Sequence, residues 1–126
     1  MMIINGATLT TFEISPNGDM VSINVTDENS TPGSLVLPAD CLRALLMSLP
    51  KMIQEALQRR YRDASVRLVY PLGKWYLEAS TESGKLILTM STRDGFAVSF
   101  LVTPDELDEL SIAAQQARHA RVPPRN

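Results

Sequence analysis

Residues 96–107 read FAVSFLVTPDEL, and this short stretch contains a strand, the start of a helix and the junction between them. Apolar side chains occupy every second position over residues 96–102, which is typical of a strand with one buried face. Thr103 and Glu106 have the spacing of a capping box, with Pro104 at the first helical position. We therefore expect an amphipathic C-terminal helix whose apolar residues are Leu107, Leu110, Ile112, Ala113 and Ala117.

The segments before this stretch predict more strands. In the second half, apolar side chains alternate over residues 66–70, 75–79 and 86–90, with glycine-containing turn signals between the runs. Together with residues 96–102 they predict a four-stranded antiparallel meander. In the first half, residues 7–37 predict a hairpin around the turn Ser15-Pro16-Asn17-Gly18, followed by a third short strand at residues 35–37.

After Pro38, the spacing of apolar residues changes from every second position to the spacing of a helix. Apolar residues recur at spacings of three and four from Leu42 to Leu57, which indicates one stripe on a long helix. Pro50 lies inside this pattern, and its missing N–H either kinks the helix or splits it. Because the stripe continues across the proline, a kink is the expected outcome.

The two halves of the chain resemble each other at a shift of 65 residues, which places Phe12 on Leu77, Ile23 on Leu88 and Leu35 on Phe100. A duplication would produce this resemblance. The apolar pattern that any two units of strands followed by a helix have in common would produce it as well. The expected fold is α+β, with antiparallel sheets of about seven strands and two helices. We expect a single domain over residues 1–120, with half-repeats 7–62 and 65–120, and a disordered tail over residues 121–126.

Composition narrows the classes of function. The chain has 126 residues and a net charge of −2, with one cysteine, Cys41, and one histidine, His119. These counts argue against multi-cysteine zinc sites and most histidine chemistry, and no phosphate-binding glycine motif is present. We expect no catalytic residues, no metal and no cofactor, and we expect Cys41 to be a buried or half-buried packing residue. The single thiol favours a cytoplasmic protein, and no apolar stretch is long enough to span a membrane.

Basic and aromatic residues concentrate in one segment, residues 59–76. It holds every tyrosine, the only tryptophan and five bases, in a region where residues 43–75 carry seven bases and two acids. Bases bind phosphates and aromatic faces stack on unpaired bases, so the segment predicts single-stranded nucleic-acid binding. The candidate residues are Arg59, Arg60, Arg62, Arg67, Lys74, Tyr70 and Tyr76. In the structural alternative, Trp75 faces the core and the arginines complement the end of a helix.

The order of antiparallel strands followed by a helix, present twice, resembles the whirly and transcription-coactivator type of single-stranded DNA-binding fold. That resemblance implies that two such units pair and that their sheets present a nucleic-acid surface. The chain also resembles short uncharacterised proteins of Burkholderia-type proteobacteria, which implies a bacterial origin and carries over no activity or site residue.

Two functions follow from these patterns. The first is a non-enzymatic bacterial domain that binds single-stranded nucleic acid through the candidate residues. The alternative is a protein-interaction or self-associating module, in which exposed apolar positions such as Met47, Met52 and Ile53 form the seam of a homodimer.

Overall fold

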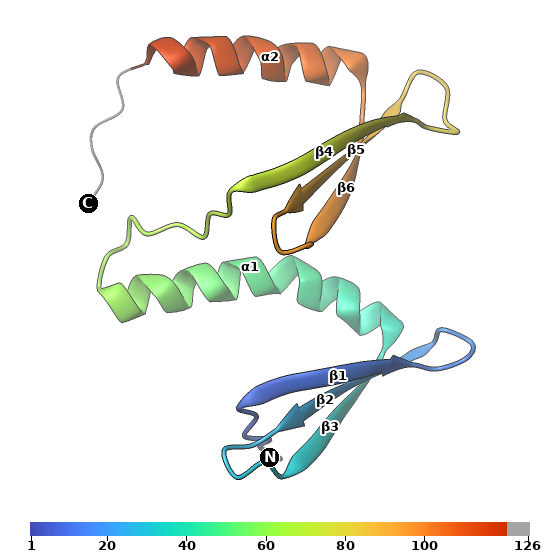
Figure 1. Ribbon diagram of the computed structural model, residues 1–126, viewed down its shortest axis with the longest axis vertical. Helices are drawn as coiled ribbons and strands as arrows, with labels where there is room; N and C mark the ends of the chain where they lie inside the picture. The colour runs from blue at the N-terminus through green and yellow to red at the C-terminus, as the bar shows by residue number, and fades with distance from the viewer. Residues whose placement is uncertain (121–126) are drawn as a thin grey trace. The chain divides into compact units, whose positions relative to one another are not determined.

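The computed structural model describes residues 1–120 and has an α+β fold (Figure 1). Its elements are β1 (Thr8–Ile14), β2 (Met20–Thr26), β3 (Pro32–Pro38), α1 (Ala39–Tyr61), β4 (Leu72–Ala79), β5 (Leu86–Thr92), β6 (Ala97–Val102) and α2 (Pro104–His119). The predicted class and both helices are confirmed. Over the described residues there are six strands in two separate three-stranded sheets, rather than about seven. The predicted disordered tail, residues 121–126, lies outside the described part of the chain.

The chain divides into two compact units, Met1–Leu68 and Val69–Asn126. The first contains the antiparallel sheet β1-β2-β3 and α1, and the second contains the antiparallel sheet β4-β5-β6 and α2. Each unit therefore has three consecutive strands followed by a helix, as the predicted half-repeats require.

Residue pairing inside the two sheets repeats with the spacing found in the sequence. Phe12 stands opposite Ile23 in the first sheet, and the residues 65 positions further on, Leu77 and Leu88, stand opposite each other in the second. The β2–β3 and β5–β6 ladders keep the same spacing. The two units therefore share their strand order and their register.

One predicted strand is absent, because residues 66–70 form no ladder. The backbone of this segment forms hydrogen bonds to side chains of α1 instead. Gln58 Nε2 donates to the Val66 carbonyl at 3.0 Å, and the Leu68 N–H donates to Gln54 Oε1 at 3.0 Å. Pro71, which follows directly, has no N–H to give to a ladder. Residues 66–70, which we call the strap, therefore carry an alternating apolar pattern but are held by α1 and do not form a fourth strand.

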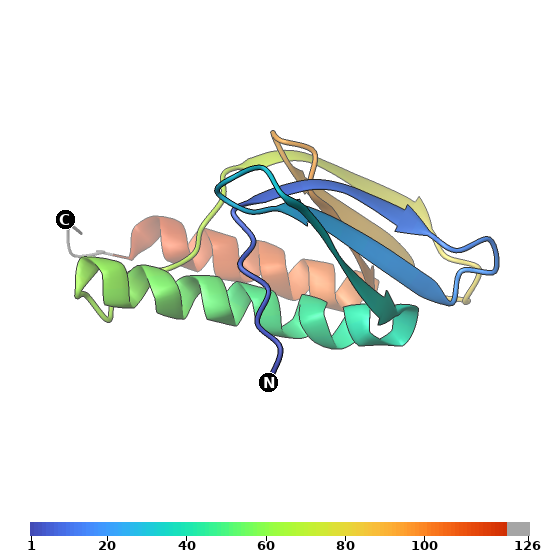
Figure 2. The ribbon, with the colours of Figure 1, turned by 90° about the horizontal axis from the view of Figure 1, so that it is seen from below.

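No loop separates either helix from its sheet. Pro38 is both the last residue of β3 and the N-cap of α1, and the Ala39 N–H donates to the Asp19 carbonyl at 2.7 Å. Thr103 alone lies between β6 and α2. Its Oγ1 accepts from the Glu106 N–H at 3.2 Å, and Glu106 Oε1 accepts from the Thr103 N–H at 2.9 Å. The predicted capping box is confirmed, and Figure 2 shows each helix leaving the end of its own last strand.

α1 runs unbroken through Pro50, so the proline does not split it. The ring removes the hydrogen bond that residue 50 would give to the preceding turn, and nearby Ser48 Oγ donates to the Ala44 carbonyl at 2.8 Å. The alternative of a split helix is thus excluded, and the expected kink stays a prediction.

Candidate interaction surfaces

One face of the β4–β6 sheet is apolar apart from Thr92 at its end. The ladders place Leu77 beside Leu88, and Leu88 beside Phe100, so the alternation of each strand defines the whole face. Its members are Trp75, Leu77, Ala79, Leu86, Leu88, Met90, Val98, Phe100 and Val102. Only Leu88, at the centre, is buried, whereas Trp75 is 60% exposed and Phe100 is 51% exposed. We call this set the second apolar face.

The β1–β3 sheet has the equivalent face, which we call the first apolar face. It consists of Leu9, Phe12, Ile14, Val21, Ile23, Val25, Leu35 and Leu37. A bulge between Leu9 and Thr11 keeps Leu9 on this side of the sheet. Val21 is the buried residue here, and Phe12 is 69% exposed. Among the described residues, Val21 and Leu88 are the only buried hydrophobic side chains.

Neither helix covers the apolar face of the sheet in its own unit. Within the first unit, α1 contacts the sheet mainly along β3, and within the second unit α2 makes no more than marginal contact with β4, β5 or β6. Their apolar side chains are accordingly exposed, with Met47 at 77%, Met52 at 49% and Ile53 at 41% on α1, and Leu110 at 56% on α2. Each unit therefore contains an amphipathic helix and an amphipathic sheet that do not cover each other.

Three of the candidate bases lie at the C-terminal end of α1. Arg59 pairs with Glu55 at 3.0 Å, an exposed i,i+4 pair. Arg60 and Arg62 form no ion pair with any residue of the described chain. Arg62 ends the helix in the left-handed conformation, with φ of 50°, and its N–H donates to the Arg59 carbonyl at 3.3 Å. This end of α1 therefore presents exposed positive charge where the carbonyl ends of the helix favour it.

The other candidates lie further along the chain. Arg67 is exposed within the strap, and Tyr70, its last residue, is 56% exposed. Lys74 and Tyr76 belong to the polar face of β4, opposite Ser91 and Thr89. The candidate site is therefore divided, with the four arginines in the first unit and Tyr70, Lys74 and Tyr76 in the second.

The structure adds one base that the sequence reasoning missed. Arg93 and Lys74 both line a depression of about 430 Å³ at the end of the second sheet. Its other lining residues are Gly73, Ser91, Thr92 and Gly95. Arg93 belongs to the turn Arg93-Asp94-Gly95, which the pattern indicates only as a turn. The register that brings it near Lys74 depends on the bulge at Gly73, which carries no distinct sequence signal.

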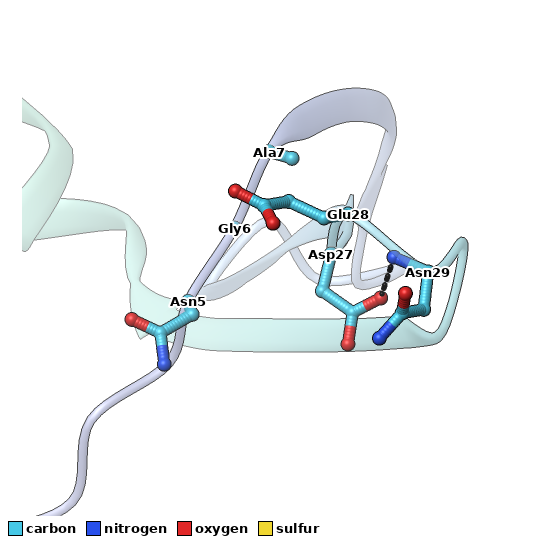
Figure 3. Close-up of a pocket in the computed structure, with 6 residues that line it drawn as sticks. All are labelled: Asn5, Gly6, Ala7, Asp27, Glu28 and Asn29. Carbon is cyan, nitrogen blue, oxygen red and sulfur yellow. Dashed lines mark hydrogen bonds between the residues drawn. The ribbon is translucent and has the colours of Figure 1, made fainter.

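A second depression, of about 440 Å³, lies beside the loop after β2 and is lined by Asn5, Gly6, Ala7, Asp27, Glu28 and Asn29 (Figure 3). Asp27 Oδ1 accepts from the Asn29 N–H at 2.9 Å and from the Thr31 N–H at 2.8 Å. The carboxylate of Asp27 therefore organises the loop. Among residues 1–120, no three His, Cys, Asp or Glu side chains are grouped as a metal site would require.

Cys41 is exposed, so the prediction that it is buried or half-buried is wrong. Cys41 lies in the first turn of α1, where its neighbours Ala39 and Leu42 are half-buried and Cys41 itself faces solvent. Within residues 1–120, neither helix combines the length and the apolar character that a membrane crossing needs.

Comparison of the chain with protein-family models, with curated proteins and with solved structures finds no match.

Proposed function

We propose that the chain is a non-enzymatic binding module that acts by self-association. The observation that carries this proposal is the pair of apolar faces, one on each sheet, which the helix of the same unit does not cover. Apolar surface removed from water stabilises a protein by about 25 cal/mol per Å². A sheet that leaves a whole apolar face in water forgoes that stabilisation, and contiguous faces of this kind mark protein interfaces.

The composition of the exposed residues also supports an interface. The first apolar face combines phenylalanine with branched aliphatic side chains, and α1 adds Met47 and Met52 beside Ile53. Aromatic residues and methionine are enriched at the centres of interfaces, where charged residues are depleted. Both apolar faces are free of charged side chains.

Sedimentation or light-scattering mass, measured over at least a hundredfold range of protein concentration, tests this proposal. We expect a mass of at least twice 13.9 kDa at the higher concentrations. A strictly monomeric protein over the whole range would contradict the proposal.

A second candidate function is single-stranded nucleic-acid binding, in keeping with the resemblance to the whirly type of fold. The observation that favours it is the exposed charge of Arg60 and Arg62, which form no ion pair among residues 1–120, together with Lys74 and Tyr76 on the polar face of β4. Phosphates pair with such bases, and an exposed tyrosine beside a lysine suits a stacked base. We further propose a bacterial, cytoplasmic setting, where the exposed thiol of Cys41 stays reduced.

Fluorescence anisotropy with labelled single-stranded DNA and RNA, at low and at physiological salt, tests this second candidate. We expect binding that weakens as salt rises and persists near physiological ionic strength. Absence of binding even at low salt would contradict it and would leave self-association as the function.

A further inference from the structure

We propose that one end of the second sheet binds the phosphomonoester group of a small molecule through Lys74 and Arg93. Both bases line the depression of about 430 Å³ at that end. We call its lining residues the basic corner, and they are Gly73, Lys74, Ser91, Thr92, Arg93 and Gly95. The inference goes beyond self-association and does not depend on it, because the basic corner is complete within the second unit.

The position of a β-bulge places Lys74 on the polar face of the sheet. In the first sheet the extra residue lies between Leu9 and Thr11, and Leu9 stays on the apolar face. The residue 65 positions after Leu9 is Lys74. In the second sheet the extra residue is Gly73, directly before Lys74, and Lys74 pairs with Ser91. The shifted bulge therefore transfers this position from the apolar face to the polar face, and bulges next to binding sites often re-aim a side chain in this way.

This bulge depends on the absence of a side chain at Gly73. A Cβ there would lie 2.8 Å from the Thr92 carbonyl carbon and 2.9 Å from the Arg93 nitrogen, both of which are backbone atoms. β4 can therefore approach the turn after β5 this closely only with glycine at residue 73. The close approach brings Lys74 and Arg93 to one depression.

The charge of the basic corner matches a dianion. Lys74 and Arg93 are exposed, and neither forms an ion pair with any residue of the described chain. Asp94 follows Arg93 in the turn but does not line the depression. A phosphomonoester carries a charge of about −1.5 to −2 at pH 7, which two bases together neutralise. A carboxylate carries a single negative charge and would leave one base without a partner.

The lining residues also supply hydrogen-bond donors. Arginine presents a planar fork of N–H groups that fits two phosphate oxygens, and lysine adds a point charge. Ser91 lies opposite Lys74, and its Oγ donates to the Lys74 carbonyl at 3.4 Å. Because that bond is longer than the usual O–H···O range of about 2.5–3.0 Å, the hydroxyl can readily turn to a phosphate oxygen. The depression of about 430 Å³ also has room for the organic group that carries the phosphate.

The first unit has an equivalent corner with the opposite charge. Its depression of about 440 Å³ also lies between the start of the first strand of the sheet and the loop after the second strand. The residues 65 positions before Thr92 and Arg93 are Asp27 and Glu28, and both acids line this depression (Figure 3). We call it the acidic corner. The repeat therefore contains its own control, because like charge disfavours a phosphate at the acidic corner.

A titration of the amide resonances with adenosine 5′-monophosphate and with adenosine tests the proposal, since the two ligands differ only in the phosphate group. Glycine amides report on both corners, Gly73 and Gly95 on the basic corner and Gly6 on the acidic corner. At constant ionic strength, we expect the monophosphate to shift the Gly73 and Gly95 resonances saturably and adenosine to leave them unchanged. The Gly6 resonance should respond to neither ligand.

Substitutions with a matched control identify the groups that bind. The double variant Lys74→Gln, Arg93→Gln should weaken binding of the monophosphate about tenfold or more, because it removes both charge-assisted contacts. Lys85→Gln, which removes an exposed base of the same unit already paired with Glu82, should change the affinity less than about twofold. Arg93→Glu gives the basic corner an acid where the acidic corner has Glu28 and should abolish binding. Far-UV circular dichroism checks that each variant is folded.

A single-stranded thymidine oligonucleotide without a terminal phosphate distinguishes a nucleic-acid strand from a phosphomonoester. We expect the Gly73 and Gly95 resonances to saturate at lower concentrations of the monophosphate than of the oligonucleotide. Tighter binding of the oligonucleotide that the double variant abolishes would overturn the assignment to a phosphomonoester. It would instead add Lys74 and Arg93 to the nucleic-acid candidate.

Other results would overturn the site itself. Absence of a saturable shift up to about 10 mM of the monophosphate would exclude a phosphate site at the basic corner. Equal shifts of Gly6 and Gly73 would mean that the ligand does not distinguish the two corners. Binding that survives in Arg93→Glu would place the ligand elsewhere. The mass of the protein over a concentration series, measured separately, keeps each of these failures distinct from a failure of self-association.

Discussion

Leu88 pairs with Leu77 across the β4–β5 ladder and is the one buried hydrophobic side chain among residues 69–120. Its neighbour on the other side is Phe100 of β6. The centre of the second sheet thus depends on a single row of three side chains.

Leu88→Ala should destabilise the protein by about 2–3 kcal/mol, because it removes the buried side chain at the centre of that row and its contacts with the two neighbours. Urea denaturation at one fixed protein concentration measures the change, since self-association makes the midpoint depend on concentration. Ile87→Ala, one residue away on the polar face, is the control and should cost less. Equal losses in the two variants would contradict the assignment of the faces.

Thr103→Ala should cost about 1 kcal/mol of folding stability, because the side-chain oxygen that accepts from the Glu106 N–H is lost. Ser111→Ala, at an exposed position in the middle of α2, serves as the control and should be neutral or slightly stabilising. Urea denaturation of both variants checks the difference. If Thr103→Ala left the folding stability unchanged, the capping box would not stabilise the junction between β6 and α2.

Gly73→Ala should destabilise the second sheet by about 1–3 kcal/mol, because a Cβ there would lie 2.8 Å from the Thr92 carbonyl carbon. Because this carbon belongs to the backbone of Thr92, it cannot rotate away as the end of a side chain could. Gly33→Ala is the matched control in the first sheet, where the added Cβ meets only Val25 Cγ2 at 3.8 Å. Thermal and urea unfolding should show a loss for Gly73→Ala alone.

Gln58→Ala should release the strap, because Gln58 Nε2 donates to the carbonyls of Ala64 and Val66. Hydrogen exchange of the Leu68 amide reports this, since that N–H donates to the neighbouring Gln54. We expect its exchange to accelerate several-fold. Glu55→Gln, which removes only an exposed ion pair, should leave the exchange rate unchanged; equal acceleration in both variants would contradict the role of Gln58.

If the chain binds single-stranded nucleic acid, the double variant Arg60→Gln, Arg62→Gln should lower affinity across all sequences. The slope of log affinity against log salt should fall by about 1.4, since each phosphate contact on a single strand contributes about 0.7. Lys85→Gln, which removes a base already paired with Glu82 at 2.9 Å, is the control. Binding that the double variant leaves unchanged would exclude this end of α1 from the site.

Local signals predicted most of the secondary structure. The hairpin at Gly18, whose φ is 76°, and the capping box at Thr103 depend on residues close together in the chain, so their pattern was sufficient. The missing fourth strand has another cause. Residues 66–70 alternate as a strand would, but Gln54 and Gln58 bind their backbone, and no local pattern indicates that competition.

The candidate site was less predictable because it depends on long-range placement. Alternation correctly put Trp75 and Tyr76 on opposite faces of β4. Each helix has few contacts with the sheet that precedes it, and no local pattern indicates this placement. Arg93 was missed because its proximity to Lys74 arises from the register of the sheet and from a bulge.

The 65-residue repeat gives the chain a valency of two. Each copy brings two sheet faces in need of a helix and two helices in need of a sheet, and the common register makes the two pairs alike. A pair of copies that saturates all four faces is a closed particle of fixed mass. If the two halves of one chain instead engage different neighbours, growth proceeds without a natural end. Closure, and not affinity alone, would therefore separate a discrete dimer from a filament.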